Sequence, residues 1–443
     1  MLLMGNGRVI TRDEAPPYLD EGCVAMDGGL IVELGRTAAL RAKYPQADFI
    51  DAHGGVIMPG LINAHEHIYS AFARGLAIRG YDPHGFLDIL GGLWWTLDRR
   101  LLLKDTRASA DATFIDCIEN GVTTVVDHHA SYGEIPGSLH AIGESARRFG
   151  VRADLCYEVS DRDGEEKMRQ GVRENVEWLE TAKKDSSGML AGHFGLHAQF
   201  TLSDETLRLC RESAPEGAGF HIHVAEGIED VYDSLRKYGK PPAFRLYDFG
   251  ILGERSICGH CTHVSEAEID LLKETGTLVA HNPESNMGNA IGCPPTIRML
   301  HKGITVGLGT DGYTNDMLES LKVAKLLHQH HLHDATTAWG EAPQMLFENN
   351  AKMASRFFGR PIGTLAPGAA ADVIALDYDP LTPLSAENIG GHVLFGMSGR
   401  SVIHTVIDGK PRMMDRALIG VDKAAELAHC RETAADLWRR VNA

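Results

Sequence analysis

Two histidines separated by one residue end an apolar run near residue 60. The stretch Met58 to Ser70 reads Met-Pro-Gly-Leu-Ile-Asn-Ala-His-Glu-His-Ile-Tyr-Ser, so His65 and His67 lie two positions apart. In a β-strand, side chains at i and i+2 point to the same face, and two imidazoles that converge in this way can bind one metal ion. Glu66 points to the other face, where we expect it to meet the helical layer and to pair with a cation.

Polar side chains also follow most other apolar runs of the central chain. They are Asp127, His128 and His129; His197 and Gln199; His221, His223 and Glu226; His260; His281 and Asn282; and Asp311. One histidine at a strand end is more often a hydrogen-bonded structural residue than a ligand. A histidine at nearly every strand end indicates a metal or substrate site, because so many buried imidazoles would otherwise leave polar atoms without partners.

These side chains require a scaffold that brings many strand ends together. Strand patterns alternate with helical patterns along the central chain, and eight strands are predicted. They are Gly55–Ala64, Thr123–His128, Arg152–Glu158, Leu190–Gln199, Gly219–Ala225, Ser256–His260, Thr277–His281 and Thr305–Gly309. Eight βα units predict an α/β fold, the (β/α)8 TIM barrel, whose chemistry lies at the C-terminal ends of the strands.

Both ends of the chain carry short strand patterns closed by turn residues. Ala371–Leu376 and Val402–Ile407 complement the strand patterns found before residue 58. We therefore expect a small β-sandwich domain built from residues 1–57 and 363–443, the second part including a terminal helix. The barrel would occupy residues 58–362.

Composition narrows the class of partner. The 443-residue chain is 44% hydrophobic and carries a formal net charge of −17, which disfavours a nucleic-acid partner because such binding relies on Lys and Arg. No signal-peptide pattern or membrane-spanning apolar run is present, so we expect a cytoplasmic protein without a membrane partner. The eight cysteines are scattered, which disfavours a disulfide framework.

Several motifs together resemble the amidohydrolase superfamily, in its cytosine- and guanine-deaminase-like branch of aminohydrolases and chlorohydrolases. They are Pro59-Gly-Leu-Ile-Asn-Ala-His-Glu-His67, His221-Ile-His-Val-Ala-Glu226, Gly259-His260, His281-Asn-Pro-Glu-Ser-Asn286, Gly309-Thr-Asp311-Gly312 and Gly363–Asp372. Within that branch, Leu93–Arg99, Asp127–Ser131 and Ser285–Asn289 are similar to the SsnA-type aminohydrolases, a group whose substrate the resemblance does not supply.

Three nitrogens and one oxygen form the expected metal-ligand set. The ligands are His65, His67, His223 and Asp311, and the resemblance implies the same four residues. This set suits Zn²⁺ best, with Fe²⁺ also possible. A second metal in this superfamily usually needs a bridging carboxylate, often a modified lysine at the end of strand four, but this strand ends His197-Ala-Gln199. We therefore expect one divalent metal per chain.

The expected proton-transfer residues lie next to these ligands. Glu226 follows His223 by three residues, so it can lean over a water bound to the metal, whose pKa the metal would lower towards roughly 7. The resemblance implies that Asp311 and His260 take the proton from the water and orient it. It also implies that Glu226 protonates the ring nitrogen and then the departing amine.

The expected substrate residues come from strand ends and from a tryptophan segment. They are His129, His197, Gln199, Trp95 and Asn282. Trp94 and Trp95 follow strand one and could form a lid over a flat ring, although helix core is the ordinary alternative for either of them. Gln199 stands where this branch often has proline, and it offers an additional amide.

Taken together with these residues, the resemblance implies a hydrolase that acts on C–N bonds other than peptide bonds. The expected reaction is metal-dependent hydrolytic deamination of a purine-, pterin- or triazine-like ring, with release of ammonia. A chlorohydrolase or a cyclic amidase of the same fold is the alternative, because these residues do not fix the leaving group. A non-catalytic barrel subunit is a further alternative, and it predicts no tightly held metal. We expect a homo-oligomer, with a dimer the simplest form.

Overall fold

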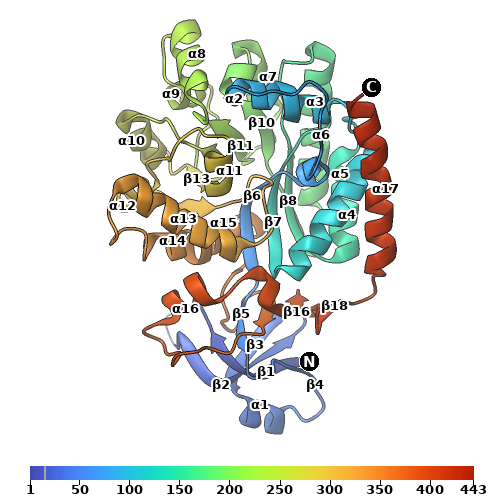
Figure 1. Ribbon diagram of the computed structural model, residues 1–443, viewed down its shortest axis with the longest axis vertical. Coiled ribbons are helices and arrows are strands. Elements are labelled where there is room, and N and C mark those ends of the chain that lie inside the picture. The colour runs from blue at the N-terminus through green and yellow to red at the C-terminus, as the bar shows by residue number, and fades with distance from the viewer. Residues whose placement is uncertain (14–15) are drawn as a thin grey trace.

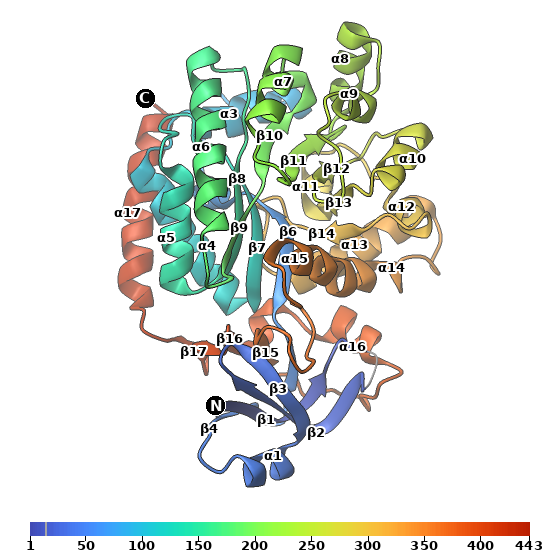
Figure 2. The same ribbon diagram turned by 180° about the vertical axis from the view of Figure 1, so that it is seen from behind.

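A helix-covered barrel stands on a strand-rich domain in the computed structural model, which describes residues 1–13 and 16–443 (Figure 1). The view from behind shows that the strand-rich domain contains segments from both ends of the chain (Figure 2). The C-terminal helix runs back up the side of the barrel. The two-part architecture expected from the sequence is therefore confirmed.

Eight strand positions form the barrel, and every pairing between them is parallel. The strands are β6 (Leu61–Glu66), β7 (Val122–His129), β8 (Arg152–Tyr157), β9 (Leu190–Gly192) with β10 (Phe194–Ala198), β11 (Phe220–Val224), β12 (Ile257–His260), β13 (Leu278–His281) and β14 (Val306–Leu308). The fourth position is split between β9 and β10, at His193. Every residue of β7 is buried, as expected for a strand covered on both faces.

The barrel consists of two sheets, β6–β9 and β10–β14. Backbone hydrogen bonds join these sheets at their two junctions, called seams below. Thr310 N and Asp311 N donate to His65 O at 2.9 and 3.0 Å, and His197 N donates to Val159 O at 2.9 Å. Gly309 permits the first seam, because a Cβ at this position would lie 2.8 Å from the backbone nitrogen of His65. The seam therefore holds Asp311 directly beside the first strand end.

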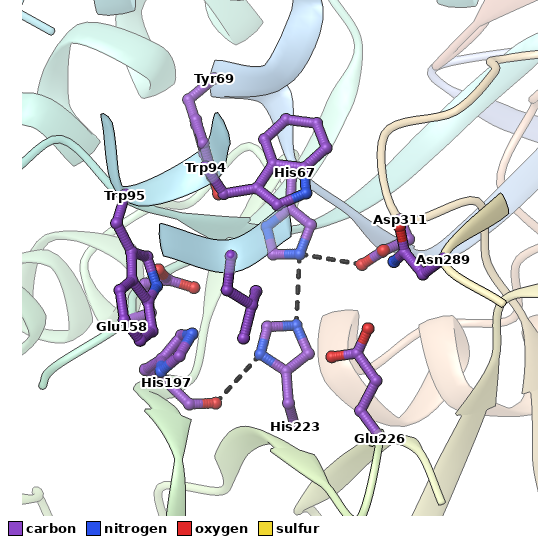
Figure 3. Close-up of a pocket in the computed structure, with 11 residues that line it drawn as sticks. His67, Tyr69, Trp94, Trp95, Glu158, His197, His223, Glu226, Asn289 and Asp311 are labelled. Atoms are coloured by element: carbon purple, nitrogen blue, oxygen red, sulfur yellow. Dashed lines mark hydrogen bonds and ion pairs between the residues drawn. The ribbon is translucent and has the colours of Figure 1, made fainter. Parts of the chain in front are cut away.

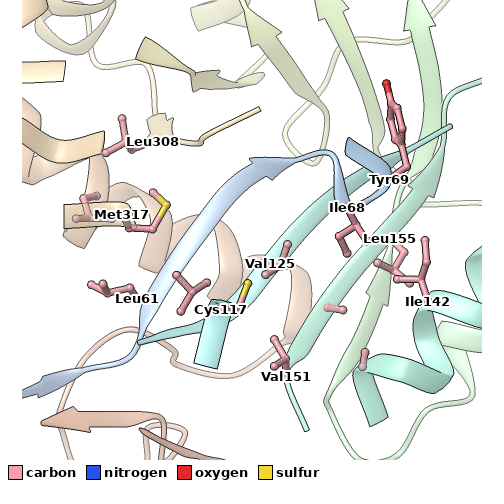
Figure 4. Packing of buried hydrophobic residues seen from close by; sticks show 14 of the residues in the cluster. Leu61, Ile68, Tyr69, Cys117, Val125, Ile142, Val151, Leu155, Leu308 and Met317 are labelled. Atoms are coloured by element: carbon pink, nitrogen blue, oxygen red, sulfur yellow. The ribbon is translucent and has the colours of Figure 1, made fainter. Parts of the chain in front are cut away.

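Helices surround the barrel and supply most of its hydrophobic core. After the first strand come η1 (Ile68–Ala73), α2 (Phe86–Ile89), η2 (Leu90–Trp94), α3 (Trp95–Asp98) and α4 (Leu103–Glu119). The others are α5 (Ser138–Phe149), α6 (Glu165–Lys183), η3 (Gln199–Thr201), α7 (Asp204–Ser213), α8 (Ile228–Tyr238), α9 (Pro242–Asp248), α10 (Glu266–Glu274), α11 (Pro283–Gly288), α12 (Thr296–His301), α13 (Met317–Leu332), α14 (Glu341–Pro343), η4 (Gln344–Asn349) and α15 (Asn350–Phe358). Figure 4 shows Leu61 and Val125 of the strands packed with Cys117 of α4 and Ile142 of α5.

The strand-rich domain is assembled from two distant parts of the chain. Its strands are β1 (Leu2–Ile10), β2 (Tyr18–Asp27), β3 (Leu30–Arg36), β4 (Asp48–Asp51), β5 (Val56–Pro59), β15 (Val373–Leu376), β16 (Val402–Ile407), β17 (Lys410–Met414) and β18 (Ala417–Leu418), with helices α1 (Thr37–Lys43), η5 (Gly399–Ser401) and α16 (Ile389–Gly396). Met4, Val24 and Ile57 share one hydrophobic core with Val373 and Val406. Neither terminal part could form this core alone.

The strand predicted as Gly55–Ala64 is in fact two strands that belong to different sheets. β5 pairs with β15 and β1 in the terminal domain, whereas β6 pairs with β7 in the barrel. The chain changes partners at Pro59-Gly60, where proline has no N–H to continue a ladder and Gly60 N donates to Asp372 O. The predicted domain boundary after residue 57 therefore falls inside β5.

Buried polar contacts join the two domains. Arg152 of β8 and Asp372 form an ion pair at 3.2 Å, with both side chains almost fully buried. The terminal helix α17 (Lys423–Val441) packs on α4, and Trp438 Nε1 donates to Phe72 O at 2.7 Å.

All eight cysteines are free thiols. Within the described ranges, none of the helices combines the length and the apolar character that a membrane crossing requires.

Candidate active site

Three imidazoles and one carboxylate converge at the C-terminal ends of the barrel strands. Figure 3 shows two of these imidazoles, His67 and His223, together with Asp311. His65 Nε2 and His67 Nε2 each lie 2.9 Å from Asp311 Oδ1. His67 Nε2 lies 3.2 Å from His223 Nε2. The structure therefore brings together the four residues that were predicted as metal ligands.

Backbone carbonyls fix which nitrogen of two of these rings is free. His67 Nδ1 lies 2.5 Å from His128 O, and His223 Nδ1 lies 3.0 Å from His197 O. A carbonyl oxygen can only accept a hydrogen bond, so each Nδ1 carries the proton and each Nε2 presents a lone pair.

A chain of side chains orients the third ring. His65 Nδ1 lies 2.8 Å from His221 Nε2, and His221 Nδ1 lies 3.8 Å from Cys156 Sγ. The Cys156 thiol donates in turn to Asp127 O at 3.4 Å. If every donor points towards Asp127 O, His65 Nδ1 carries a proton and His65 Nε2 is left free to bind a metal.

The donor set fits a divalent metal. Two imidazole lone pairs 3.2 Å apart repel each other unless a cation lies between or beside them, and Asp311 adds a negative charge to the same point. His65, His223, His260 and Asp311 also offer ligand atoms that all lie within 4.8 Å of one another. Nitrogen and carboxylate donors of this kind suit zinc.

Three strand ends of the site have backbone conformations that are rare for residues with side chains. Ala225 after β11, His260 in β12 and Asp311 after β14 have φ values of 48°, 65° and 59°. Non-glycine residues in the left-handed region cost on the order of 1–3 kcal/mol each and concentrate at functional sites. This conformation turns the chain sharply, and His260 and Asp311 lie close to His65 and His223.

Glu226 lies beside His223 and faces His260. His260 Nε2 is 3.6 Å from Glu226 Oε2 and 3.6 Å from Asp311 Oδ1. Burial raises the pKa of Glu226 to about 7, opposed by the charge of His260 and assisted by that of Asp311. A carboxyl group with a pKa in this range can both donate and accept a proton near neutral pH.

Hydrogen bonds hold the other two proton-transfer candidates. His260 Nδ1 lies 2.8 Å from Asn286 Oδ1, which is an acceptor, so His260 Nε2 is the nitrogen that faces Glu226 and Asp311. Ser285 Oγ donates to Asp311 Oδ2 at 2.5 Å, leaving Oδ1 towards the histidines. Both Ser285 and Asn286 come from α11, so the segment after β13 positions these groups.

A cavity opens directly beside these residues. Its lining consists of His67, Tyr69, Leu90, Trp94, Trp95, Glu158, His197, His223, Glu226, Asn289 and Asp311. Trp94 and Trp95 both line it, at the junction of η2 and α3, and the Trp95 ring packs edge-on against His197 at 5.9 Å. The cavity therefore combines aromatic walls with a polar floor, as a flat polar ring requires.

The expected substrate residues divide into two groups. His197 and Trp95 line the cavity, whereas His129, Gln199 and Asn282 do not. The Gln199 side chain is fully buried behind the wall, where it donates to Asp230 O and accepts from Arg245. Asn282 Nδ2 lies 3.5 Å from His260 Nε2, close to the proton-transfer residues. The additional amide expected from Gln199 is thus used in packing.

Four residues that line the cavity were not predicted as site residues from the sequence: Tyr69, Leu90, Glu158 and Asn289. Glu158 follows β8 directly and is only 2% exposed. The rule that polar residues after a barrel strand face the site would have found it, because it is the residue that ends the third predicted strand. Leu90, Tyr69 and Asn289 lie on segments after the strands, where no periodic pattern marks them.

Glu66 differs from expectation. Its carboxyl group is buried and accepts hydrogen bonds from Asn63 Nδ2 and from Thr310 Oγ1, the latter at 2.7 Å. Both partners are neutral, in place of the expected cation. Burial raises the pKa of Glu66 to about 8, and the group ties β6 to the segment after β14.

The sequence matches known families over most of its length. The profile of the "Amidohydrolase family" matches residues 56–412, and that of the "Imidazolonepropionase-like composite domain, bacteria" matches residues 22–47. The chain is 30% identical to a 5'-deoxyadenosine deaminase of Methanosarcina mazei, over 100% of this chain and 99% of the relative. It is 31% identical to a 5-methylthioadenosine/S-adenosylhomocysteine deaminase of Thermococcus onnurineus, over 94% and 95% of the two chains.

Solved structures show the same fold. An adenosine deaminase from Xanthomonas campestris with bound zinc superimposes with a TM-score of 0.87, at 25% identity over 98% of each chain. An atrazine chlorohydrolase from Arthrobacter aurescens with zinc gives a TM-score of 0.82, at 22% identity over 98% of this chain and 100% of the other, which is a likeness of fold. With a family profile that spans four-fifths of its length and full-length relatives at 30% identity, this chain belongs to the amidohydrolase family.

Proposed function

We propose that this protein is a zinc-dependent hydrolytic deaminase of an aminated nitrogen heterocycle, of the purine, pterin or triazine type. One observation carries the proposal: the Glu226 carboxyl group faces His260 and Asp311 at the edge of a three-histidine, one-aspartate donor set, in a cavity lined by aromatic rings. The relatives named as deaminases of adenosine derivatives, and the zinc reported in the two similar structures, support it.

The metal would be held by His65, His67 and His223 through Nε2 and by Asp311 through a carboxylate oxygen. When bound, it supplies Lewis acidity and lowers the pKa of a coordinated water molecule. The protein then has to position the ring and move protons.

Glu226 is placed for the proton transfers to the substrate. Its carboxyl group faces the cavity, so a ring nitrogen beside the reacting carbon can take a proton from Glu226, and the departing amine can receive one later. His260 Nε2 and Asp311 Oδ1, 3.6 Å apart, are placed to take and hold the proton that the attacking water loses.

The walls of the cavity orient the ring and limit access of solvent. Trp94 and Trp95 offer aromatic surface, and Leu90 adds an apolar contact. An uncharged ring with polar atoms matches a lining in which aromatic rings stand beside closely spaced polar side chains. The proposed partner is therefore a small neutral molecule.

Ammonia release from zinc-loaded protein tests the proposal. The panel contains 5'-deoxyadenosine, 5-methylthioadenosine, an aminopterin ring and an aminotriazine, with a chlorotriazine assayed for chloride. We expect ammonia from at least one aminated ring and no chloride release above background. Chloride release without ammonia would instead make the protein a chlorohydrolase, and a folded, zinc-loaded protein that releases neither would contradict the proposal.

Two further expectations accompany this function. We propose that the protein is cytoplasmic and a homodimer. Cell fractionation and light scattering in solution check these two points.

A further inference from the structure

Glu158 lies in the active-site cavity, but the proposed reaction gives it no task. In Figure 3 it stands beside Trp95 and His197, across the cavity from Glu226. Its backbone is fixed on both sides, because its N–H donates to His129 O at 2.9 Å and its carbonyl accepts from Tyr132 Oη at 2.7 Å. A buried carboxylate held in one place needs a partner.

The neighbours of Glu158 leave its acceptor capacity unused. Arg162 Nη2 is 3.9 Å away, beyond hydrogen-bond distance, and its guanidinium instead forms a two-point ion pair with Asp98, at 2.5 and 3.2 Å. His128 Nδ1 lies 3.3 Å from Glu158 Oε2 but forms no hydrogen bond, since His128 Nε2 donates to two backbone carbonyls. Arg162 and His128 therefore locate the carboxylate without saturating it.

His197 offers a second acceptor on the same wall. Its Nδ1 lies 2.8 Å from Thr201 Oγ1, and that hydroxyl donates its own proton to Ala198 O at 2.9 Å. The His197 proton therefore lies on Nδ1, and Nε2 is left as a lone pair. Glu158 and His197, named here the acceptor wall, have ligand atoms within 4.8 Å of each other.

The spacing of the acceptor wall suits a nitrogen donor better than a second metal. One amino group that donates two hydrogen bonds of about 2.9 Å spans acceptors up to about 5 Å apart. A metal would need a third ligand, but the nearest candidate, His223, directs Nε2 to the first metal site and uses Nδ1 in a hydrogen bond to His197 O. Trp95 beside the wall is also a neighbour expected for an organic ring.

We propose that Glu158, together with His197, binds a second N–H donor of the substrate ring, distinct from the amine that is released at Glu226. This inference rests on the proposed deaminase function and narrows its substrate class. Diaminopurines, pterins and aminotriazines carry such a second donor, whereas the ring of an adenine nucleoside carries one amino group only. Glu158 is thus a specificity-determining residue.

The test compares adenosine with 2,6-diaminopurine riboside on the zinc-loaded protein. The two rings differ by one amino group, and both can release ammonia from the same carbon. We expect the ratio of kcat/KM to favour the diamino ring by about ten- to a hundredfold in the unaltered protein, as for a hydrogen bond to a charged group. In Glu158→Gln the ratio should fall towards one, mainly through KM, because the carboxamide turns a donor towards the ring.

Two companion variants make the result specific. Glu180→Gln, on the exposed face of α6, makes the same chemical change away from the cavity and should leave the ratio as it is. His197→Phe keeps a ring against Trp95 and removes the acceptor, so it should also lower the ratio and serves if Glu158→Gln does not fold. An unchanged ratio in both cavity variants would overturn the proposal.

Metal analysis and calorimetry separate the remaining outcomes. Two zinc ions in the unaltered protein and one in Glu158→Gln would make Glu158 a metal ligand and overturn the proposal. If neither nucleoside releases ammonia, the protein is not a deaminase of these rings. Calorimetric binding of the two nucleosides then tests the role of Glu158 separately. Tighter binding of the diamino ring by the unaltered protein than by Glu158→Gln would support the acceptor wall, and equal or absent binding would contradict it.

Discussion

Among the residues that the structure describes, two candidate metal-binding clusters combine histidine with aspartate, and the hydrogen bonds around only one of them leave its histidine nitrogens free. The first lies in the barrel and includes His65, His67, His223 and Asp311. The second lies in the strand-rich domain and consists of His53, His404 and Asp415, whose ligand atoms lie within 4.8 Å of one another. The residue types are the same, but the hydrogen bonds around them differ.

In the second cluster, the buried histidine has no nitrogen to spare. His404 Nε2 lies 2.9 Å from Asp51 O, and His404 Nδ1 accepts from Asp415 N at 3.1 Å. His53 and Asp415 are 63% and 69% exposed, so water competes for both. In the barrel, by contrast, the carbonyls of His128 and His197 hold only Nδ1 of each ring, and Nε2 remains free. Closeness of histidine and aspartate side chains is therefore not enough to make a metal site. Each ring must also keep one nitrogen free of hydrogen bonds to the protein.

Loss of one barrel ligand should have the largest effect. His223→Ala removes a nitrogen donor from the centre of the site, so zinc should be lost and ammonia release should fall to background, by about 10⁶-fold, the lower end of enzymatic rate enhancements. Metal analysis and the ammonia assay measure this, and chelation of the unaltered protein followed by zinc addition provides the reversible control. Retention of zinc and activity by His223→Ala would remove His223 from the ligand set.

Glu226→Gln should give the next largest effect and should separate proton transfer from metal binding. The carboxamide has nearly the same shape but cannot move a proton, so kcat should fall by about 10²- to 10⁴-fold while zinc content stays the same. Steady-state kinetics and metal analysis of the same sample measure both quantities. Near-normal turnover in a zinc-loaded Glu226→Gln protein would exclude Glu226 from the mechanism.

His221 should affect metal affinity without being a ligand. His221→Leu removes the acceptor of His65 Nδ1, and zinc affinity should fall by about 10- to 100-fold, as for other partners of ligand histidines. His221→Gln offers an oxygen near the same place and should restore most of the affinity. Competition with a zinc chelator measures both variants, and equal affinity in all three proteins would show that the chain through His221 is dispensable.

The second cluster should show the smallest effect. His404→Ala breaks the contacts to Asp51 O and Asp415 N, which should cost about 1–3 kcal/mol of unfolding free energy, but zinc content and kcat should stay as they are. Denaturant unfolding and metal analysis check this. A stoichiometric loss of zinc in His404→Ala would mean that the two clusters are equivalent after all.

The sequence contained enough to predict the barrel and the cluster of polar side chains that the structure brings together at its strand ends. His65, His67, His223, His260 and Asp311 stand directly at or after apolar runs, and parallel strands in a barrel bring such ends together. The same reasoning reached His197, and the aromatic segment after the first strand suggested Trp95; both residues line the cavity. That reasoning also explains why Glu158 was within reach, since this residue ends the third predicted strand.

Other features could not be predicted because they depend on contacts between distant segments. Gln199 sits at a strand end, yet Asp230 and Arg245 draw its side chain behind the wall, and no local pattern reveals those partners. The Glu66 carboxyl group was expected to meet a cation, but it accepts hydrogen bonds from Asn63 and from Thr310, and Thr310 lies 244 residues further along the chain. The split of the first predicted strand likewise depends on β15, which lies more than 300 residues later.

That last pairing also sets an order of events during synthesis. β5 cannot complete its sheet until β15 has left the ribosome, because Pro59 pairs with Val373. At 5–20 residues per second, the interval lasts roughly 15 to 60 s. β6 carries His65, ends just before His67 and follows β5 after a single residue. These two histidines therefore depend on a segment whose sheet is completed late. A nascent chain must therefore complete the barrel and recruit its C-terminal strands before its first two ligands are fixed in place.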